Sequence, residues 1–197
     1  MKNSFNPLVD FYTKHNISPV KQDISNLEAH YRRRNTLFKE LGILPSFLKG
    51  KNIVEVGPGS GYNSIVLASA LPGRYTLVEP NPKAREDIDT LFKEFNLDLE
   101  ESIEVVPLLI EDFKNDIAYD LLVCEGMVSS LPNRYSIIDK MDTLLSSGGI
   151  MLLSCADAVS TFFENIRAYF AYELTKDIDD FEQENIKKPW ILKNEFA

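Results

Sequence analysis

The stretch Asn52–Asn63, NIVEVGPGSGYN, constrains the fold of this chain more than any other. Ile53, Val54 and Val56 predict a buried strand, and three glycines at alternate positions follow it directly. Glycine adopts positive φ at little cost and lets the backbone come close to a ligand. A helical pattern begins after the glycines, so its free N–H groups and positive end face the crevice above the strand ends. The stretch therefore predicts a strand–loop–helix unit of an α/β sheet with a ligand-binding loop.

The spacing of the glycines distinguishes two ligand classes. A dinucleotide fingerprint has the pattern G-x-G-x-x-G, with the third glycine packed beneath a pyrophosphate. Tyr62 stands at that third place, and Gly61 comes one residue earlier. This difference disfavours an NAD-dependent oxidoreductase. A tight turn without a ligand is a further alternative, but three glycines and a proline within five residues exceed what a turn needs.

Glu79 is the second informative residue. It ends a predicted strand, 75–79, about 20 residues beyond the glycine loop. A carboxylate at this place can accept two hydrogen bonds from a ribose diol, and a solvated glutamate at a strand end is the alternative. Together with the loop, Glu79 predicts a ligand that contains adenosine.

The rest of the chain alternates between strand and helix patterns, which is typical of one doubly wound α/β domain. Pro107 ends the third strand, and a proline suits an edge strand. Predicted strands are 52–56, 75–79, 102–106, 119–124 and 150–154; predicted helices are 8–14, 25–41, 64–71, 82–95, 134–147 and 162–174.

Two later helices carry apolar residues that we expect to face the core. In the helix after Asn133 these are Tyr135, Ile138, Met141 and Leu145. In helix 162–174 the aromatic run resembles ordinary core packing more than a substrate box. Its inward residues are expected to be Phe163, Ile166, Tyr169 and Phe170.

The run E-V-G-P-G-S-G resembles motif I of the class I S-adenosylmethionine-dependent methyltransferases. The chain also looks like a bacterial subgroup of unassigned substrate, with an arginine-rich helix, C-E-G after the fourth strand and a later S-C-A-D-A-V-S segment. The resemblance covers roughly residues 52–174. It implies a mostly parallel sheet in the order 3-2-1-4-5 with helices on both faces, and the remaining residues show no pattern for the last two strands of the full fold.

The same resemblance implies a function. The expected enzyme is a cytoplasmic methyltransferase that moves a methyl group from S-adenosylmethionine to a small or medium-sized O or N nucleophile. The alternative is a non-catalytic regulatory or assembly module that binds the same cofactor. The two alternatives differ in whether methyl transfer follows binding.

The resemblance also implies which residues contact the cofactor. An aspartate that the family often places after the third strand is Leu109 here, so Glu111 or Asp112 could replace it, or backbone and apolar contacts could hold the adenine. The expected cofactor-binding residues are Glu55, Gly57, Pro58, Gly59, Ser60, Gly61, Asn63, Glu79, Pro80, Asn81, Ile110, Glu111, Asp112 and Glu125, with Tyr31 and Arg34 from the N-terminal helix.

The loop after the fourth strand, 125–132, stands where relatives present a residue to the substrate. It lacks N-P-P-Y or D-P-P-Y, which disfavours the methyltransferases that act on amines of nucleobases and glutamine. Glu125 is the best candidate for a catalytic general base or a substrate anchor. A cofactor-orienting or purely structural role is the alternative.

The predicted domain plan has three parts. Residues 1–48 form a helical segment that caps the cofactor site, 49–175 form the cofactor-binding core, and 176–197 form a tail that either is truncated or belongs to a minimal five-stranded version of the fold. Ser25 and Glu28 predict a capping box for the helix that ends before Gly42. Its apolar stripe is expected to contain Leu27, Tyr31, Phe38 and Leu41, with Arg34 either extending past the packing or paired with a carboxylate.

Composition limits the expected partners. The net charge of −9 and the pI near 4.8 argue weakly against a nucleic-acid or anionic-membrane partner, so a small-molecule substrate is expected. The one dense basic run is Arg32–Arg34. Cys124 and Cys155 are expected to be reduced core thiols, and neither they nor the histidines show metal-ligand spacing. The sequence leaves the methyl acceptor and the oligomeric state open.

Overall fold

A computed structural model describes residues 7–18, 22–97, 102–157, 159 and 161–175. The predicted tail, 176–197, lies outside these residues. The chain divides into two compact units: residues 1–124 with 139–152, and residues 125–138 with 153–197. Each unit is considered by itself below.

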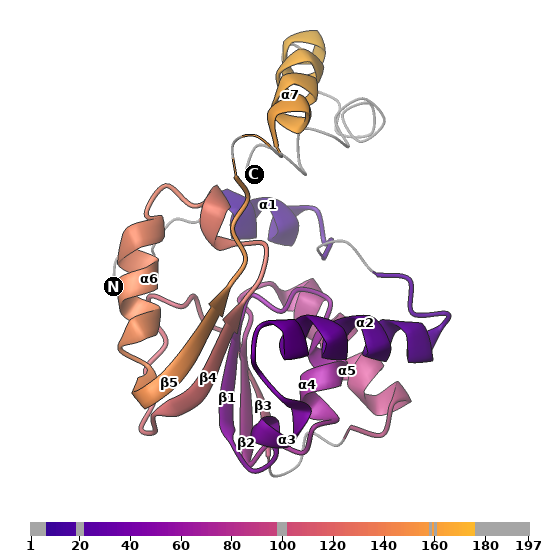
Figure 1. Cartoon of the computed structure of the whole chain (residues 1–197). Coiled ribbons are helices and arrows are strands. Elements are labelled where there is room, and N and C mark those ends of the chain that lie inside the picture. The colour runs from indigo at the N-terminus through magenta and orange to yellow at the C-terminus, as the bar shows by residue number, and fades with distance from the viewer. Residues whose placement is uncertain (1–6, 19–21, 98–101, 158, 160, 176–197) are drawn as a thin grey trace. The chain divides into compact units, whose positions relative to one another are not determined.

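Five strands form one sheet in the order β3-β2-β1-β4-β5 (Figure 1). β1 pairs in parallel with β2 and β4, and β2 pairs in parallel with β3. The predicted strand order is therefore confirmed, and β3 lies at an edge as Pro107 indicates. The strands are β1 (Asn52–Val56), β2 (Arg74–Val78), β3 (Ile103–Val106), β4 (Tyr119–Cys124) and β5 (Leu145–Leu153).

The helices α2, α4 and α5 lie together on one side of the sheet (Figure 1). Their apolar faces and the sheet form one buried cluster that includes Phe38, Ile53, Leu77 and Ile88, all fully buried. Burial of each such side chain contributes about 1.5–3 kcal/mol. The helices are α1 (Pro7–Lys14), α2 (Leu27–Glu40), α3 (Pro45–Leu48), α4 (Ser64–Ala68), α5 (Pro82–Glu94), α6 (Arg134–Asp142) and α7 (Phe162–Thr175), with a 3-10 turn η1 (Val128–Ser130).

The ends of α2 confirm one prediction and correct another. The N-cap is Asn26, whose side chain accepts the Ala29 N–H at 2.9 Å. The predicted capping box at Ser25 is wrong because the Ser25 N–H instead donates to Asp23. At the other end, Gly42 has φ +79° and the Ile43 N–H donates to the Phe38 carbonyl at 2.8 Å. This is the Schellman arrangement that a glycine after a helix predicts.

The buried face of α2 agrees with most of the predicted stripe, because Phe38 is buried and Leu27 and Tyr31 are partly buried against the core. His30, Arg34 and Phe38 are buried at i, i+4 and i+8, whereas Leu41 is 53% exposed. Arg34 was expected within the stripe, whereas His30 was missed because a histidine carries no hydrophobic signal. His30 is buried with hydrogen-bond partners, and the Arg34 guanidinium lies over the Phe38 ring, as described below.

The exposed fractions of side chains in the second half of the chain correct several predictions made from the sequence. Tyr135 is 74% exposed, and the buried residues of α6 are Ile137 and Met141. Leu145 belongs to β5, which starts before Gly148 and Gly149 rather than after them. The predicted core side chains of α7 are exposed: Phe163 by 72%, Ile166 by 37%, Tyr169 by 62% and Phe170 by 61%. The periodicity identified an apolar stripe correctly, but it does not reveal what covers that stripe.

Two further findings concern the cysteines and the helices. Cys124 is buried at the end of β4, as expected, whereas Cys155 is exposed and is not a core thiol. In the described part of the chain, no helix combines the length and the apolar character needed to cross a bilayer.

Candidate functional site

The glycine loop begins at the carboxyl end of β1, and a backbone hydrogen bond ties it to β2. Gly57, Gly59 and Gly61 have φ of +68°, +58° and +81°, a region that other residues rarely adopt. The Gly57 N–H donates to the Val78 carbonyl of β2 at 3.0 Å. A Cβ on Gly61 would lie 2.9 Å from Cγ1 of Ile88, so α5 packs directly against the loop. At Gly61, therefore, the loop has no room for a larger side chain.

Glu79 follows β2 and is bonded to that loop. Its Oε2 accepts the Gly59 N–H at 3.0 Å, and its Oε1 accepts the Asn81 N–H at 2.9 Å. The residue is only 5% exposed. Burial raises the pKa of Glu79 from 4.5 to about 7, although the two N–H donors act in the opposite direction. Each carboxylate oxygen has a second acceptor position, so the acid can still receive hydroxyl donors.

The segment that contains α1 lies beside Glu79. Burial raises the pKa of Tyr12, and the negative charge of Glu79 raises it further. The Asn81 side-chain amide donates to the Ile17 carbonyl at 2.9 Å, and the Ser18 hydroxyl donates to Asp87 at 2.5 Å. Sequence reasoning missed Tyr12, because its place near Glu79 depends on a contact between residues far apart in the chain.

A buried polar cluster lies on β1 and β2, below the loop. The hydroxyl of Tyr75 donates to the Glu55 carboxylate, and both residues are buried. Burial, followed by the charge of Glu55, raises the pKa of Tyr75 well above its usual value, and the charge of Arg34 acts in the opposite sense. Arg34 is 6% exposed and its guanidinium carbon lies 5.2 Å from the Phe38 ring centroid. Glu55 and Arg34 therefore take part in an internal network.

His30 connects α2 to the end of the glycine loop. Its Nε2 lies 2.8 Å from the Tyr62 carbonyl, and its Nδ1 lies 3.0 Å from Nη2 of Arg33. A carbonyl only accepts and a guanidinium only donates, so these partners assign the neutral tautomer with the proton on Nε2. Burial lowers the pKa of His30. Sequence reasoning missed this residue, although its spacing of four from Arg34 was a usable signal.

Tyr31, the neighbour of His30, contacts α4 rather than the loop. Its hydroxyl donates to the Ile65 carbonyl at 3.3 Å and lies 2.5 Å from the Ser69 hydroxyl. The structure thus directs Tyr31 to a helix and His30 to the loop. The two residues are consecutive in α2, so a step of one position along the helix separates these two roles.

The remaining predicted residues fall in three places. Ser60 is buried in the loop, whereas Asn63 and Pro80 are half-buried beside it. After β3, a turn closed by the Asp112 N–H on the Leu109 carbonyl at 3.1 Å carries buried Ile110, half-buried Glu111 and exposed Asp112. Glu125 directly follows β4, is half-buried, and is the first residue of the second unit.

This arrangement fits an adenosyl ligand better than a metal ion. The loop offers close backbone approach, and Glu79 offers acceptor positions at the neighbouring strand end, as a ribose requires. Within the described residues there is no group of three or more His, Cys, Asp or Glu side chains that could hold a metal.

Comparison with known proteins gives a family match. A family model described as a methyltransferase domain matches residues 28–189. The ribosomal RNA small subunit methyltransferase G of Campylobacter jejuni strain RM1221 is 25% identical over 172 residues, which is 86% of this chain and 82% of that protein. The protein of the same name from Coxiella burnetii strain RSA 493 is 27% identical over 132 residues, which is 66% of this chain and 58% of that protein.

Solved structures give the same fold. The N-methyltransferase NodS from Bradyrhizobium japonicum WM9 with S-adenosyl-l-homocysteine has a TM-score of 0.60 and 18% identity, over 80% of this chain and 78% of that one. Magnesium protoporphyrin IX methyltransferase (ChlM) from Synechocystis PCC 6803 with bound SAM has a TM-score of 0.59 and 15% identity, over 79% of each chain. At such identities the likeness concerns the fold.

The curated relatives correct the expected partner. Net charge predicted a small-molecule substrate and made nucleic acid an unlikely partner, but the relatives are named for ribosomal RNA. The prediction is wrong because net charge sums the whole surface, whereas an RNA contact depends on the charge of one local area.

Proposed function

This chain belongs to the family of methyltransferase domains, and we propose that it transfers a methyl group from S-adenosylmethionine to a nitrogen or oxygen atom of an RNA nucleotide. The activity and the cofactor follow from the family and from neighbours that hold S-adenosyl ligands. The RNA acceptor is supported by the ribosomal RNA methyltransferase that aligns with 86% of this chain. An RNA acceptor made in the cytoplasm also agrees with two reduced thiols, Cys124 and Cys155.

We assign the cofactor to the loop Gly57–Gly61 and the acid after β2. The loop would receive the amino-acid and sugar parts at close backbone distance, and Glu79 would accept the ribose hydroxyls. Asn81 and Gly59 orient the Glu79 carboxylate through their N–H groups, so it is placed before the ligand arrives. The turn carrying Ile110, Glu111 and Asp112 is assigned to the adenine side, and residues 1–48 are assigned to cover the site.

The chemistry asks the protein mainly for placement. The cofactor supplies a methyl group on a sulfonium, a good leaving group that becomes a neutral thioether. The protein holds the acceptor atom in line with the methyl carbon, and orientation of this kind accelerates a reaction greatly. The acceptor gains the methyl carbon and loses a proton wherever it began protonated. We assign that proton to Glu125.

A methyl-transfer assay tests the proposal. The full chain is incubated with S-adenosylmethionine carrying a tritiated methyl group and, separately, with small ribosomal subunits, their naked RNA, total protein and a pool of small metabolites. Label is expected in the RNA. Digestion to nucleosides then shows whether a base nitrogen or a ribose oxygen carries it.

The matched control is Gly59→Val, which places a branched side chain in the glycine loop. This variant is expected to lose cofactor binding in calorimetry, because valine disfavours φ +58° and the shifted backbone would move the N–H that orients Glu79. Label that enters only protein or small metabolites would refute the RNA acceptor. Cofactor affinity unchanged by Gly59→Val would refute the placement of the cofactor.

A further inference from the structure

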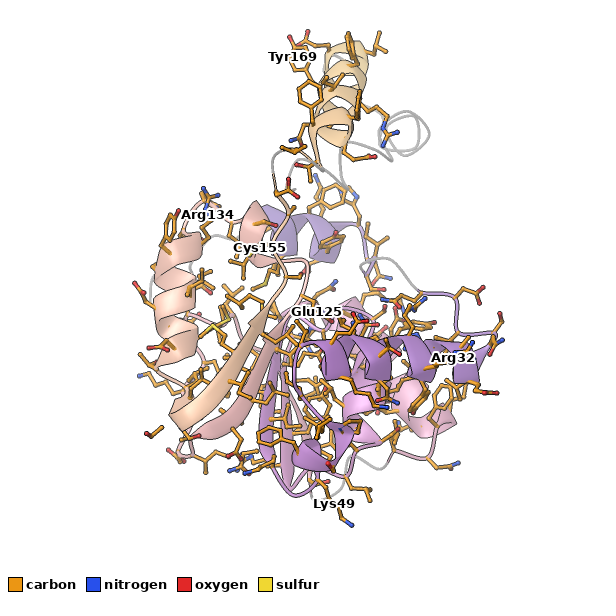
Figure 2. The ribbon with its side chains drawn as sticks, in the orientation of Figure 1. Arg32, Lys49, Glu125, Arg134, Cys155 and Tyr169 are labelled. Atoms are coloured by element: carbon orange, nitrogen blue, oxygen red, sulfur yellow. The ribbon has the colours of Figure 1, made fainter. Side chains whose placement is uncertain are left out.

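The second unit contains a cavity of about 460 Å³. It lies between η1, the start of α6, the segment after β5 and the start of α7, all of which belong to this unit. Its size is within the range of roughly 300–1,000 Å³ that small ligands occupy. Figure 2 labels Arg134 at the start of α6 and Cys155 on the segment after β5. The lining residues are Val128, Ser129, Arg134, Tyr135, Ile138, Cys155, Ala156, Thr161 and Asn165.

The cavity is electrostatically unlike the rest of the molecule. The whole chain has 30 acidic and 21 basic side chains, yet the described lining contains Arg134 and no carboxylate. Hydroxyl and amide groups of Ser129, Thr161 and Asn165 add neutral polar partners. The positive end of the α6 dipole lies at Arg134 as well. An anionic group is therefore favoured here, although the chain as a whole has a net charge of −9.

Arg134 is available for such an anion. None of the ion pairs among the described residues includes Arg134, whereas Arg74 pairs with Glu104 at 2.9 Å and Arg167 pairs with Glu164. Arg85 is engaged differently, because it donates to the Glu79 and Pro80 carbonyls. A guanidinium forms forked hydrogen bonds that match a phosphate.

The Arg134 guanidinium lies over the ring of Tyr135 in a cation–π contact. Tyr135 is 74% exposed, and the guanidinium carbon of Arg134 lies 5.5 Å from the ring centroid. An exposed aromatic ring leaves apolar surface in contact with water, and burial of that surface against a ligand is favourable in free energy. Aromatic rings and guanidinium planes are the surfaces on which unpaired RNA bases stack.

We propose that this cavity binds an unpaired nucleotide of single-stranded RNA, with its phosphate at Arg134 and its base stacked on Tyr135. The inference rests on the proposed RNA acceptor and adds where the second unit contacts that RNA. A charged guanidinium, an adjacent exposed ring and neutral polar groups around one cavity match the three parts of a nucleotide. The proposal makes no use of the glycine loop, so the two can be tested separately.

Binding is measured by fluorescence anisotropy with a short, labelled, single-stranded RNA of mixed sequence. Tyr135→Ala is expected to weaken binding on the order of tenfold, because it removes the ring on which the base stacks. Tyr135→Phe keeps the ring and is expected to bind normally. Arg134→Gln is expected to weaken binding and to reduce the slope of log affinity against log salt by about 0.7. The matched control is Tyr169→Ala, which removes another exposed tyrosine, 62% exposed, on α7 outside the cavity (Figure 2).

Cys155 gives a second readout inside the cavity. It is exposed, whereas Cys124 is buried, so N-ethylmaleimide should label Cys155 first in the native protein. Mass spectrometry is expected to show that the RNA slows this labelling several-fold and that S-adenosylhomocysteine alone does not. Cys155→Ser identifies the labelled site.

The outcomes separate this inference from the proposed function. The nucleotide site in the cavity is refuted if RNA binds the Tyr135→Ala and Arg134→Gln variants with the affinity of the native chain and does not protect Cys155. This result would leave the proposed RNA acceptor in place. Equal losses in Tyr169→Ala and Tyr135→Ala also overturn the nucleotide site, since stacking would then not be specific to the cavity. A chain that binds S-adenosylhomocysteine but no RNA overturns both proposals.

Discussion

Glu79 accepts a hydrogen bond from the Gly59 N–H at 3.0 Å, and this contact joins the acid that follows β2 to the glycine loop that follows β1. The two residues are 20 positions apart in the chain. The bond fixes the carboxylate and the loop backbone relative to each other. It also places a buried acid, with its pKa raised to about 7, in the site that we assign to the cofactor.

The pKa of Glu79 predicts opposite effects of pH on cofactor binding and on stability. A ribose diol donates to the ionised carboxylate, so affinity for S-adenosylhomocysteine is expected to rise as pH passes upward through about 7, by up to tenfold per unit below that value. The unfolded chain releases this proton near 4.5, so the same group makes folding less favourable as pH rises from 4.5 to about 7.

Calorimetric titration over this pH range and urea unfolding measure the two effects. Glu79→Gln is the control, since it keeps the shape and cannot ionise. It is expected to bind more weakly and to lose this part of the pH dependence. The assignment of the titration to Glu79 would be wrong if the variant kept the same slope.

Gly61→Ala is expected to destabilise the protein by more than Gly42→Ala. Both glycines have φ near +80°, so both variants carry a similar backbone cost of about 1–2 kcal/mol. A Cβ at Gly61 would also lie 2.9 Å from Ile88, whereas a Cβ at Gly42 meets nothing within 4 Å. The crowding is expected to add about 1–3 kcal/mol.

Urea unfolding of both variants gives the difference in the free energy of unfolding. The double variant Gly61→Ala, Ile88→Ala separates the two terms, because it removes the atom that the new Cβ meets. Its cost should be less than the sum of the single costs. Equal losses in the free energy of unfolding for Gly61→Ala and Gly42→Ala would show that Ile88 on α5 moves aside without an energetic cost.

Tyr75→Phe is expected to cost about 1.5–3 kcal/mol of stability, because it removes the donor to a buried carboxylate, Glu55. Tyr119→Phe is the matched control. Its hydroxyl donates to the Thr76 hydroxyl at 3.0 Å, a neutral bond between buried groups, and its loss is expected to cost about 0.5–1.5 kcal/mol. Urea unfolding at neutral pH compares the two. A larger loss in Tyr119→Phe would contradict the importance assigned to the Glu55 cluster.

His30 predicts a loss of stability at mildly acidic pH. Its pKa is lowered by burial, so the unfolded chain takes up a proton near 6.5 that the folded chain resists. The stabilising contribution is present above 6.5 and is lost as pH falls below it. Protonation would also place a donor on Nδ1, opposite the Arg33 guanidinium. Thermal unfolding from about pH 8 to about pH 5 should show a steeper loss in the native chain than in His30→Gln. Parallel curves would contradict this role.

The sequence anticipated the arrangement of the sheet and the core of the candidate site. β1 and β4 have the predicted bounds, and the order β3-β2-β1-β4-β5 is as expected. Asn81 caps α5 by accepting the Lys83 N–H at 3.0 Å, as an asparagine before a proline predicts. These features depend on short-range chemistry: glycine at positive φ, caps, and apolar runs of strand length.

Longer-range contacts decided the rest. The sequence by itself shows that a glycine loop follows β1 and that an acid follows β2. Only the tertiary structure placed Tyr12 beside Glu79, turned His30 rather than Tyr31 to the loop, and left Tyr135 exposed beside Arg134. Local periodicity shows which residues share a face of a helix. Which face is buried depends on the partners that other parts of the chain bring to it, and a polar side chain is buried wherever those partners satisfy it.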